Sequence, residues 1–235
     1  MIAAPRGGLD VLLVFEDLVD LPRLEQGVFA LLGAASDAQG AVASSLSPLR
    51  IHLCLPRFSV AELRAVRDAT RPIQDLCPEM AVRLHNWHLP EPHDLRVPLL
   101  NLGMERAEGR YLGCVEIGQL MSPGAYRRLH DRLVVTGHAL AVGGVEEVPV
   151  AWWGDVILPA RRRQSPKPDS LDSHHVAPAF LLDRWRISPS DLRLRAAWSG
   201  NPLRDLVTSI STSQPTDYAL ADARLCVQQI LVANI

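Results

Sequence analysis

The sequence has almost no lysine and few aromatic residues, and its charges nearly balance. Lys167 is the only lysine among 235 residues, aromatic residues make up 5%, and the formal net charge is -2. A protein that binds the phosphate backbone of nucleic acid needs a dense cationic surface, so nucleic acid is not expected as a partner. Nearly all positive charge is arginine, which can bind phosphate or carboxylate through two parallel hydrogen bonds. A GC-rich bacterial genome produces the same bias, so the bias alone assigns no site.

The sequence also lacks a cysteine motif and a long apolar run. Its four cysteines are widely spaced and form no C-x-x-C pair: Cys54, Cys77, Cys114 and Cys226. Two of them lie in apolar runs, as reduced core cysteines do, so neither disulfides nor a zinc knuckle are expected. No run approaches the roughly 20 apolar residues of a membrane span, and the first eight residues do not have the pattern of a signal peptide. We therefore expect a cytoplasmic protein without a membrane span.

Apolar runs of strand length alternate with segments of helical periodicity up to residue 142. Strands are predicted at 10–15, 49–55, 81–86, 111–115 and 138–142, and helices at 21–32, 60–69, 97–107 and 123–135. Ser59 with Glu62 is typical of a capping box, and Ser122 before Pro123 is predicted to cap another helix. This alternation predicts an α/β fold, with a mostly parallel sheet flanked by helices on both faces.

The alternation stops after Gly144. Residues 148–153 and 176–182 are apolar runs that can form strands, 203–211 is predicted to be a short helix, and 217–232 has the apolar stripe of a longer helix. Residues 159–175 are rich in Arg, Ser and Pro and are predicted to form a mobile loop. We expect one domain in two parts, residues 1–145 and 146–235.

Residues 99–129 contain a series of motif letters that resembles the central block of the family-2 glycosyltransferases of the GT-A class. That block has an N-x-G helix, an A-x-G-x-Y turn, a strand that ends in an acidic motif, and a helix opened by S/T-P-G. The matching positions are Asn101, Gly103, Ala107, Gly109, Tyr111, Met121, Pro123 and Gly124. The resemblance implies a GT-A-like (Rossmann-like) fold in which residues 1–145 bind a nucleotide sugar and residues 146–235 form a smaller acceptor-side part.

Two further segments resemble the same family. Residues 175–187 are similar to its acceptor-side strand and the arginine-containing turn that follows. Residues 217–225 (DYALADARL) are similar to the helix start that carries the catalytic base. The resemblance therefore implies that Asp217 takes the proton from the acceptor hydroxyl. The alternative is that Asp217 is an acid that stabilises a helix N-terminus.

The chain departs from the family pattern where a metal and a nucleotide are expected. The fourth strand ends in Glu116-Ile117-Gly118-Gln119 in place of Asp-x-Asp, so one carboxylate remains for Mg²⁺ or Mn²⁺. Glu116 is either a ligand on the metal and diphosphate side or an exposed remnant. His175, beside His174, is a weaker metal candidate, or an exposed loop residue. The predicted nucleotide-binding residues, taken from strand ends and from the matched block, are Phe15, Glu16, Asp17, Arg57, Asn101, Glu116 and Gly118.

Other residues have weaker functional interpretations beside structural ones. Five arginines are predicted either to pair with a diphosphate in place of a metal or to form solvated basic turns: Arg161, Arg162, Arg163, Arg184 and Arg186. Four tryptophans are predicted either to stack on a sugar or to anchor the core: Trp152, Trp153, Trp185 and Trp198. Polar residues after the third strand that contact a nucleotide base, or only solvent, are Asn86, His88 and Asp94.

The resemblance implies a glycosyltransferase that moves a sugar from a nucleoside diphosphate donor to a saccharide or other hydroxyl acceptor. It also implies inversion at the sugar, with or without a divalent cation. The alternative is a catalytically silent GT-A-like module that acts as a partner or regulatory subunit of another protein. A nucleotidyltransferase is disfavoured because residues 15–22 offer no Gly-rich loop with Lys or Arg.

Overall fold

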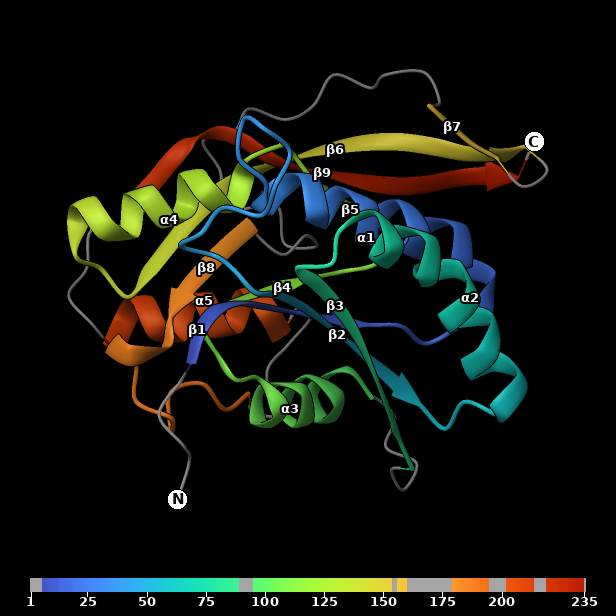
Figure 1. Cartoon of the computed structure of the whole chain (residues 1–235), viewed down its shortest axis with the longest axis horizontal. Helices are drawn as coiled ribbons and strands as arrows, with labels where there is room; N and C mark the ends of the chain where they lie inside the picture. The colour runs from blue at the N-terminus through green and yellow to red at the C-terminus, as the bar shows by residue number, and fades with distance from the viewer. Residues whose placement is uncertain are drawn as a thin grey trace.

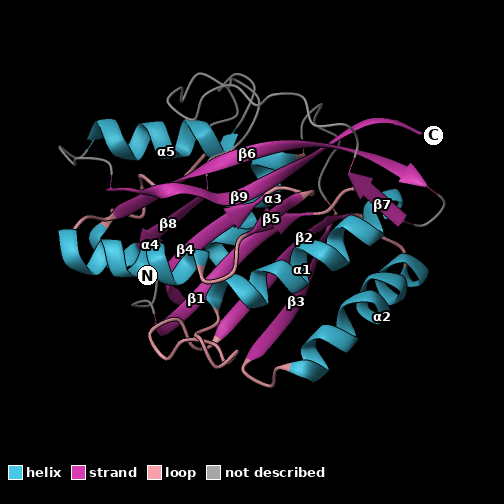
Figure 2. Cartoon of the chain, turned by 90° about the horizontal axis from the view of Figure 1, so that it is seen from above, coloured by secondary structure: helices cyan, strands magenta, loops and turns pink. Residues whose placement is uncertain are grey.

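The protein is described by a computed structural model at residues 6–88, 95–153, 156–159, 179–194, 202–213 and 219–234. These residues form a nine-stranded sheet with helices on both faces (Figures 1 and 2). Four parallel strands lie in the order β3-β2-β1-β4. Their bounds are β1 Arg6–Val14, β2 Leu49–Pro56, β3 Met80–Trp87 and β4 Gly109–Val115. The predicted α/β fold class is confirmed.

Strands that follow β4 in the sequence complete the same sheet. β8 (Ala179–Asp183) pairs antiparallel with β4 and with β6 (Leu140–Trp153). β6 also pairs with β7 (Val156–Pro159) and β9 (Ala219–Asn234), and β9 pairs with β5 (Gln119–Met121). The runs predicted as strands at 138–142 and 148–153 are thus two ends of β6, and the proposed boundary at residue 145 falls inside that strand.

The C-terminal segment shows where the prediction from periodicity is wrong. Residues 217–232 are predicted to form a helix, whereas the structure has strand β9 over Ala219–Asn234. β9 pairs in parallel with β6 and antiparallel with β5, so its backbone is hydrogen-bonded on both edges. Val227 and Ile230 belong to the predicted stripe, but β-branched side chains also favour strands. Pairing with two distant strands therefore overrides the local helical pattern.

In the described residues, five α-helices cover the two faces of the sheet. α1 (Leu21–Ala35), α2 (Val60–Leu76) and α4 (Ala125–Thr136) lie on one face, and α3 (Arg96–Arg106) and α5 (Pro202–Ser213) lie on the other (Figure 2). Two short 3-10 helices, η1 (Leu18–Asp20) and η2 (Arg184–Arg186), follow β1 and β8. Side chains of β1 alternate between the two cores, with Val11 and Leu13 in one and Leu12 in the other.

The other predicted helices are confirmed, with shifts at their ends. α2 continues past residue 69, through Pro72 to Leu76. α4 begins at Ala125, and its N-cap is Gly124 with a φ of +67°. The predicted cap at Ser122 is therefore wrong, because the left-handed turn at Gly124 delays the helix by two residues.

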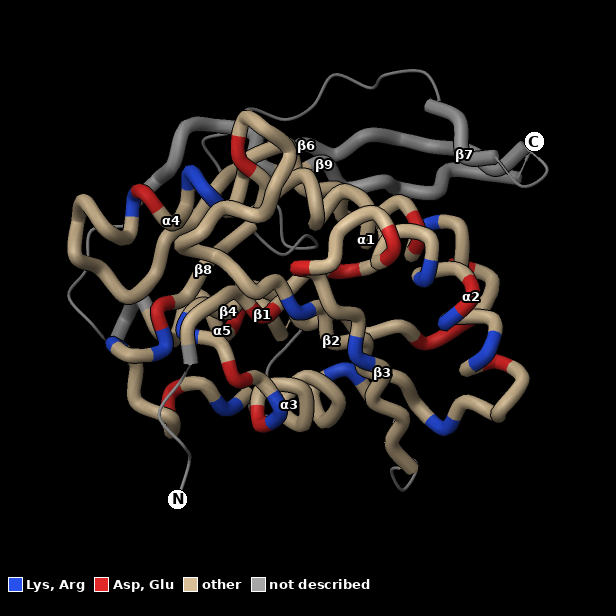
Figure 3. Tube along the Cα trace, in the orientation of Figure 1, with Lys and Arg blue, Asp and Glu red and all other residues tan. Residues whose placement is uncertain are grey.

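Charge and cysteine placement agree with an ordinary folded domain. All four cysteines are buried free thiols. Acidic and basic side chains are interspersed along the described trace (Figure 3). Among the described helices, none has the length and apolar character that crossing a bilayer requires.

The capping box at the start of α2 gives a first prediction. The Ser59 hydroxyl accepts a hydrogen bond from the Glu62 amide (3.3 Å), and the Glu62 carboxylate accepts one from the Ser59 amide (2.7 Å). Ser59→Ala is expected to lower the free energy of unfolding by about 1 kcal/mol, because the helix loses a side-chain cap. Urea unfolding measures this change. Ser59→Asp, which retains a cap, should stay near wild type, and equal stability of all three proteins would contradict the assignment.

Candidate functional site

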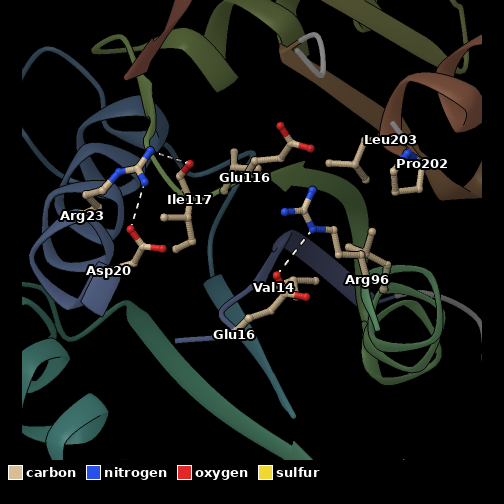
Figure 4. A pocket seen from close by; sticks show the side chains of 11 residues that line it. Val14, Glu16, Asp20, Arg23, Arg96, Glu116, Ile117, Pro202 and Leu203 are labelled. Carbon is tan, nitrogen blue, oxygen red and sulfur yellow. Dashed lines mark hydrogen bonds and ion pairs between the residues drawn. The ribbon is translucent and has the colours of Figure 1, made fainter. Parts of the chain in front are cut away.

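A cavity of about 290 Å³ opens where β1 and β4 end. Parallel strands of an open α/β sheet place ligand-binding residues at this edge. We call this cavity the β1–β4 cleft (Figure 4). Its lining comes from the ends of both strands and from η1, α1, α3 and α5: Val14, Glu16, Asp20, Arg23, Arg96, Leu100, Val115, Glu116, Ile117, Pro202 and Leu203.

A tight turn after β4 positions Glu116. The Gln119 side chain accepts a hydrogen bond from the Glu116 amide (2.9 Å), and the Gln119 amide donates to the Glu116 carbonyl (3.0 Å). Gly118 completes this turn with a φ of +83°, a conformation that L side chains rarely adopt. The half-buried Glu116 side chain lines the cleft, with Ile117 beside it and Leu203 opposite (Figure 4).

Two arginines and two more carboxylates line the same cleft. The Arg23 Nη1 atom lies 2.9 Å from the Asp20 carboxylate, and its Nη2 donates to the Ile117 carbonyl at 3.4 Å. The Arg23 side chain is 11% exposed. Arg96 lies 3.5 Å from the Glu16 carboxylate, and both of these side chains are exposed, so their pairing is weak. The cleft therefore offers cations and carboxylates together.

Of the residues that the sequence predicts to contact a nucleotide, some line the cleft and others do not. Glu16 and Glu116 line the cleft. Asp17 is exposed and caps η1 by accepting from the Val19 amide at 3.0 Å. Phe15 is fully buried, with its ring edge-to-face on Phe58 at a centroid distance of 5.7 Å. Phe15 is thus part of the apolar core in this structure.

Arg57 and two asparagines lie outside the residues that line the cleft. Arg57 is exposed at the end of β2 with a φ of +49°. The Asn101 side chain forms two hydrogen bonds with the Leu194 backbone, at 2.9 and 2.8 Å. Asn86 does the same with the Phe58 backbone, at 2.8 Å in each bond. Both asparagine side chains therefore stabilise the position of a neighbouring backbone segment by hydrogen bonding to it.

Arg184 and Arg186 lie at the other end of β4. Arg184 donates to the carbonyls of Ala107 (2.9 Å) and Gly109 (3.0 Å), and Arg186 lies 3.3 Å from the Asp183 carboxylate. Gly109 begins β4 and Glu116 follows its end, a separation of about 20 Å at the rise of an extended strand. The hypothesis that these two arginines bind a diphosphate beside Glu116 is therefore wrong. Trp185, 58% exposed, lies at that same far edge, with the Arg110 guanidinium 4.3 Å from its ring.

Several predicted residues lie outside the described part of the chain. They are the predicted base Asp217, both histidines His174 and His175, and Asp94, Arg161, Arg162, Arg163 and Trp198. Trp152 and Trp153 belong to β6, and His88 is an exposed residue just after β3. Within the described residues, no three His, Cys, Asp or Glu side chains gather closely enough to hold a metal ion.

Sequence reasoning missed the two arginines of the cleft. Arg23 is the third residue of α1, and Arg96 is the first residue of α3. A cation in the first turn of a helix opposes the helix dipole, which favours acids at that position. Two helices that begin with an unfavourable cation were therefore a usable sign that these arginines have a role other than stabilising their helices.

Comparison with known proteins shows the fold and little sequence similarity. No protein-family model matches the chain, and no curated protein sequence is similar to it. Solved structures do match, among them S. aureus TarS residues 1-349, with a TM-score of 0.63, 8% identity and 94% of this chain covered. The same fragment in complex with UDP-GlcNAc gives a TM-score of 0.61 at 9% identity, and in complex with UDP 0.63 at 9%, each covering 95% of this chain.

The chain spans 58–60% of the length of those TarS fragments. At such low identity the similarity establishes a shared fold, the GT-A-like fold that the matched block implied.

Proposed function

We propose that this protein transfers a sugar from a nucleoside diphosphate donor to a hydroxyl acceptor, with the donor's diphosphate bound in the β1–β4 cleft. The observation that carries the proposal is the set of charged residues at the carboxyl ends of β1 and β4, Glu116 with Arg23 and Arg96. The neighbours with the same fold include complexes with UDP and UDP-GlcNAc, which supports a nucleotide sugar as the donor.

The proposed reaction is a single displacement. The acceptor oxygen attacks the anomeric carbon, the bond from that carbon to the diphosphate oxygen breaks, and the diphosphate leaves with the electron pair. Asp217 would take the acceptor's proton, and the sugar would be inverted because attack and departure occur on opposite faces. Glu116 would lie on the diphosphate side.

The described residues do not assemble a set of ligands for a divalent cation. Glu16, Asp20 and Glu116 offer the hard oxygen ligands that Mg²⁺ or Mn²⁺ prefers. Asp20 and Glu16 are paired with arginines, however, and in the described part of the chain no three such ligands gather at one point. Glu116 by itself supplies too few ligands for a metal site.

A nucleotide panel tests this proposal. The purified protein is incubated with UDP, GDP and dTDP sugars, with and without Mn²⁺, while thermal shift and donor hydrolysis are measured. One donor is expected to stabilise the fold, by about 2.7 kcal/mol at a concentration 100 times its Kd. The absence of a shift with every nucleotide would rule the proposal out.

The silent GT-A-like module remains the second candidate, and the glycine at position 118 favours it. Gly118 stands where the resembled family has its second carboxylate. The cavity beside Glu116 supports the enzyme, since a module without a ligand has no need of an open cleft there. Nucleotide binding without donor hydrolysis or sugar transfer to any hydroxyl acceptor would favour the silent module.

A further inference from the structure

The Arg23 guanidinium lies against Gly118, in the space that a side chain at position 118 would need. A Cβ atom added to Gly118 would collide with the Arg23 Nη2 atom and would lie 2.9 Å from Cζ and 3.0 Å from Nε. Arg23 and Gly118 come from different elements, the first turn of α1 and the turn after β4. The glycine therefore permits a cation to occupy the floor of the cleft beside Glu116.

Two hydrogen bonds, burial and the preceding proline hold Arg23 in this position. Its guanidinium bonds to the Asp20 carboxylate at 2.9 Å and to the Ile117 carbonyl at 3.4 Å, and its side chain is 11% exposed. Pro22 precedes it within the first turn of α1 and fixes the backbone there. Figure 4 shows the two bonds from Arg23 to Asp20 and Ile117 on the side of the cleft opposite Leu203. The cation is therefore preorganised and needs little rearrangement when an anion arrives.

We infer that Arg23 is a fixed cation of the diphosphate site and performs the charge neutralisation for which a second carboxylate would recruit a metal ion. This inference rests on the proposed function, because it places the donor's diphosphate in the same cleft. A carboxylate at position 118 would attract a cation, whereas the guanidinium that takes its space is itself a cation. A guanidinium has five N–H donors, so its bond to Asp20 does not preclude donation to a phosphate.

Arg23 then acts on the leaving group. As the bond between the anomeric carbon and the diphosphate oxygen breaks, negative charge grows on that oxygen and is delocalised over the diphosphate. A preorganised cation stabilises this charge more than it stabilises the bound donor, which is the condition for accelerating the step. Arg96, which lines the cleft from the start of α3, adds a second positive charge.

Calorimetric titration with UDP and with inorganic pyrophosphate tests the inference, in EDTA and in Mg²⁺. The wild-type protein is expected to bind both probes in EDTA, within about tenfold of its affinity in Mg²⁺. Arg23→Gln is expected to weaken binding in EDTA by about tenfold or more, the loss typical of a charged hydrogen bond. Arg23→Lys, which keeps the charge but not the planar fork, should lie between them. Arg71→Gln, at a 74% exposed arginine of α2, is the matched control and should bind as wild type.

The remaining outcomes of this titration distinguish failure of the inference about Arg23 from failure of the proposed function. Wild-type binding of UDP only in Mg²⁺, or equal binding by Arg23→Gln in EDTA, would overturn the inference and leave the proposed function standing. If UDP binds in neither buffer, the titration is repeated with GDP and with dTDP. Binding of none of the three nucleotides would overturn the proposed function, and pyrophosphate binding then decides whether the cation site exists by itself. Circular dichroism checks the fold of each variant, and the comparison of buffers needs only the wild-type protein.

Discussion

Asp10→Asn is expected to lower the free energy of unfolding by about 3–5 kcal/mol, because it breaks a buried ion pair by removing one partner. The Asp10 side chain is fully buried in β1 and bonds to the Arg50 guanidinium, which is itself nearly buried. The same carboxylate accepts hydrogen bonds from the backbone amides of Glu108 and of Gly109, the latter at 2.6 Å. Asparagine keeps the volume but carries no charge and has one acceptor oxygen fewer.

Urea unfolding of wild type and variant measures this loss. Asp75→Asn is the matched control, because Asp75 is a 73% exposed partner of Arg71, and surface pairs of this kind contribute little. The control should stay within about 0.5 kcal/mol of wild type. An Asp10→Asn protein as stable as this control would show that the buried pair does not hold β1 to β2 in solution.

The pH dependence of stability provides a second readout of Asp10. Burial by itself raises the pKa of this carboxyl, but the neighbouring His52, the Gly109 amide and Arg50 outweigh it and lower the pKa to about 2. The carboxyl titrates at its ordinary 3.8 when the chain is unfolded, so the stabilisation is complete above that pH and is lost as the pH falls towards 2. A shift of this size corresponds to about 2.5 kcal/mol. Asp10→Asn should lose this acid-sensitive component.

His85 gives a separate acid-sensitive window at higher pH. Its ring stacks between His52 and Trp87, and burial, with the nearby His52, Arg106 and Arg83, lowers the pKa of His85 from 6.5 to about 4. A histidine that is neutral in the folded protein binds its proton more readily in the unfolded chain. Stability therefore falls as the pH drops from 6.5 towards 4, and Asp10→Asn should retain this window.

Local patterns were sufficient to predict most of the fold. The predicted strands and helices up to residue 142 follow periodicities that a short window contains, and the capping box at Ser59 was confirmed, but the three-residue strand β5 was not predicted. The sequence did not predict strand β9, because its pairing partners β5 and β6 lie far from it in the sequence, outside any such window. The sequence pattern identifies Asp10 only as the first residue of a strand, since Arg50 and Gly109 lie 40 and 99 residues away.

The sequence predicts only part of the candidate site. Glu116 and Glu16 could be found because they directly follow strands, where open sheets bind ligands. Arg23 could not be found in this way, because its contact with the Ile117 carbonyl joins residues 94 positions apart. Gly118 was identified as the departure from an acidic motif, but only the structure shows which side chain takes the vacated space.

Gly118→Ala is expected to weaken metal-free UDP binding by about tenfold or more without removing any charge. The added methyl group would displace the guanidinium of Arg23 from the floor of the cleft. The variant should also lose about 1–2 kcal/mol of stability, because Gly118 has a φ of +83°. Gly40→Ala is a matched control: Gly40 has a φ of +84°, and an added Cβ atom there would have no neighbour within 4 Å. It should lose similar stability and keep UDP affinity.

A double-variant cycle separates displacement of Arg23 from any other effect of the methyl group. If Gly118→Ala acts only by moving the guanidinium, then adding it to Arg23→Gln should weaken UDP binding no further, and the two effects will be strongly non-additive. Additive losses would mean that the turn after β4 contacts the nucleotide independently of Arg23. Wild-type affinity in Gly118→Ala would mean that the guanidinium binds the diphosphate from another position, and the packing of Arg23 on Gly118 would then have no part in binding.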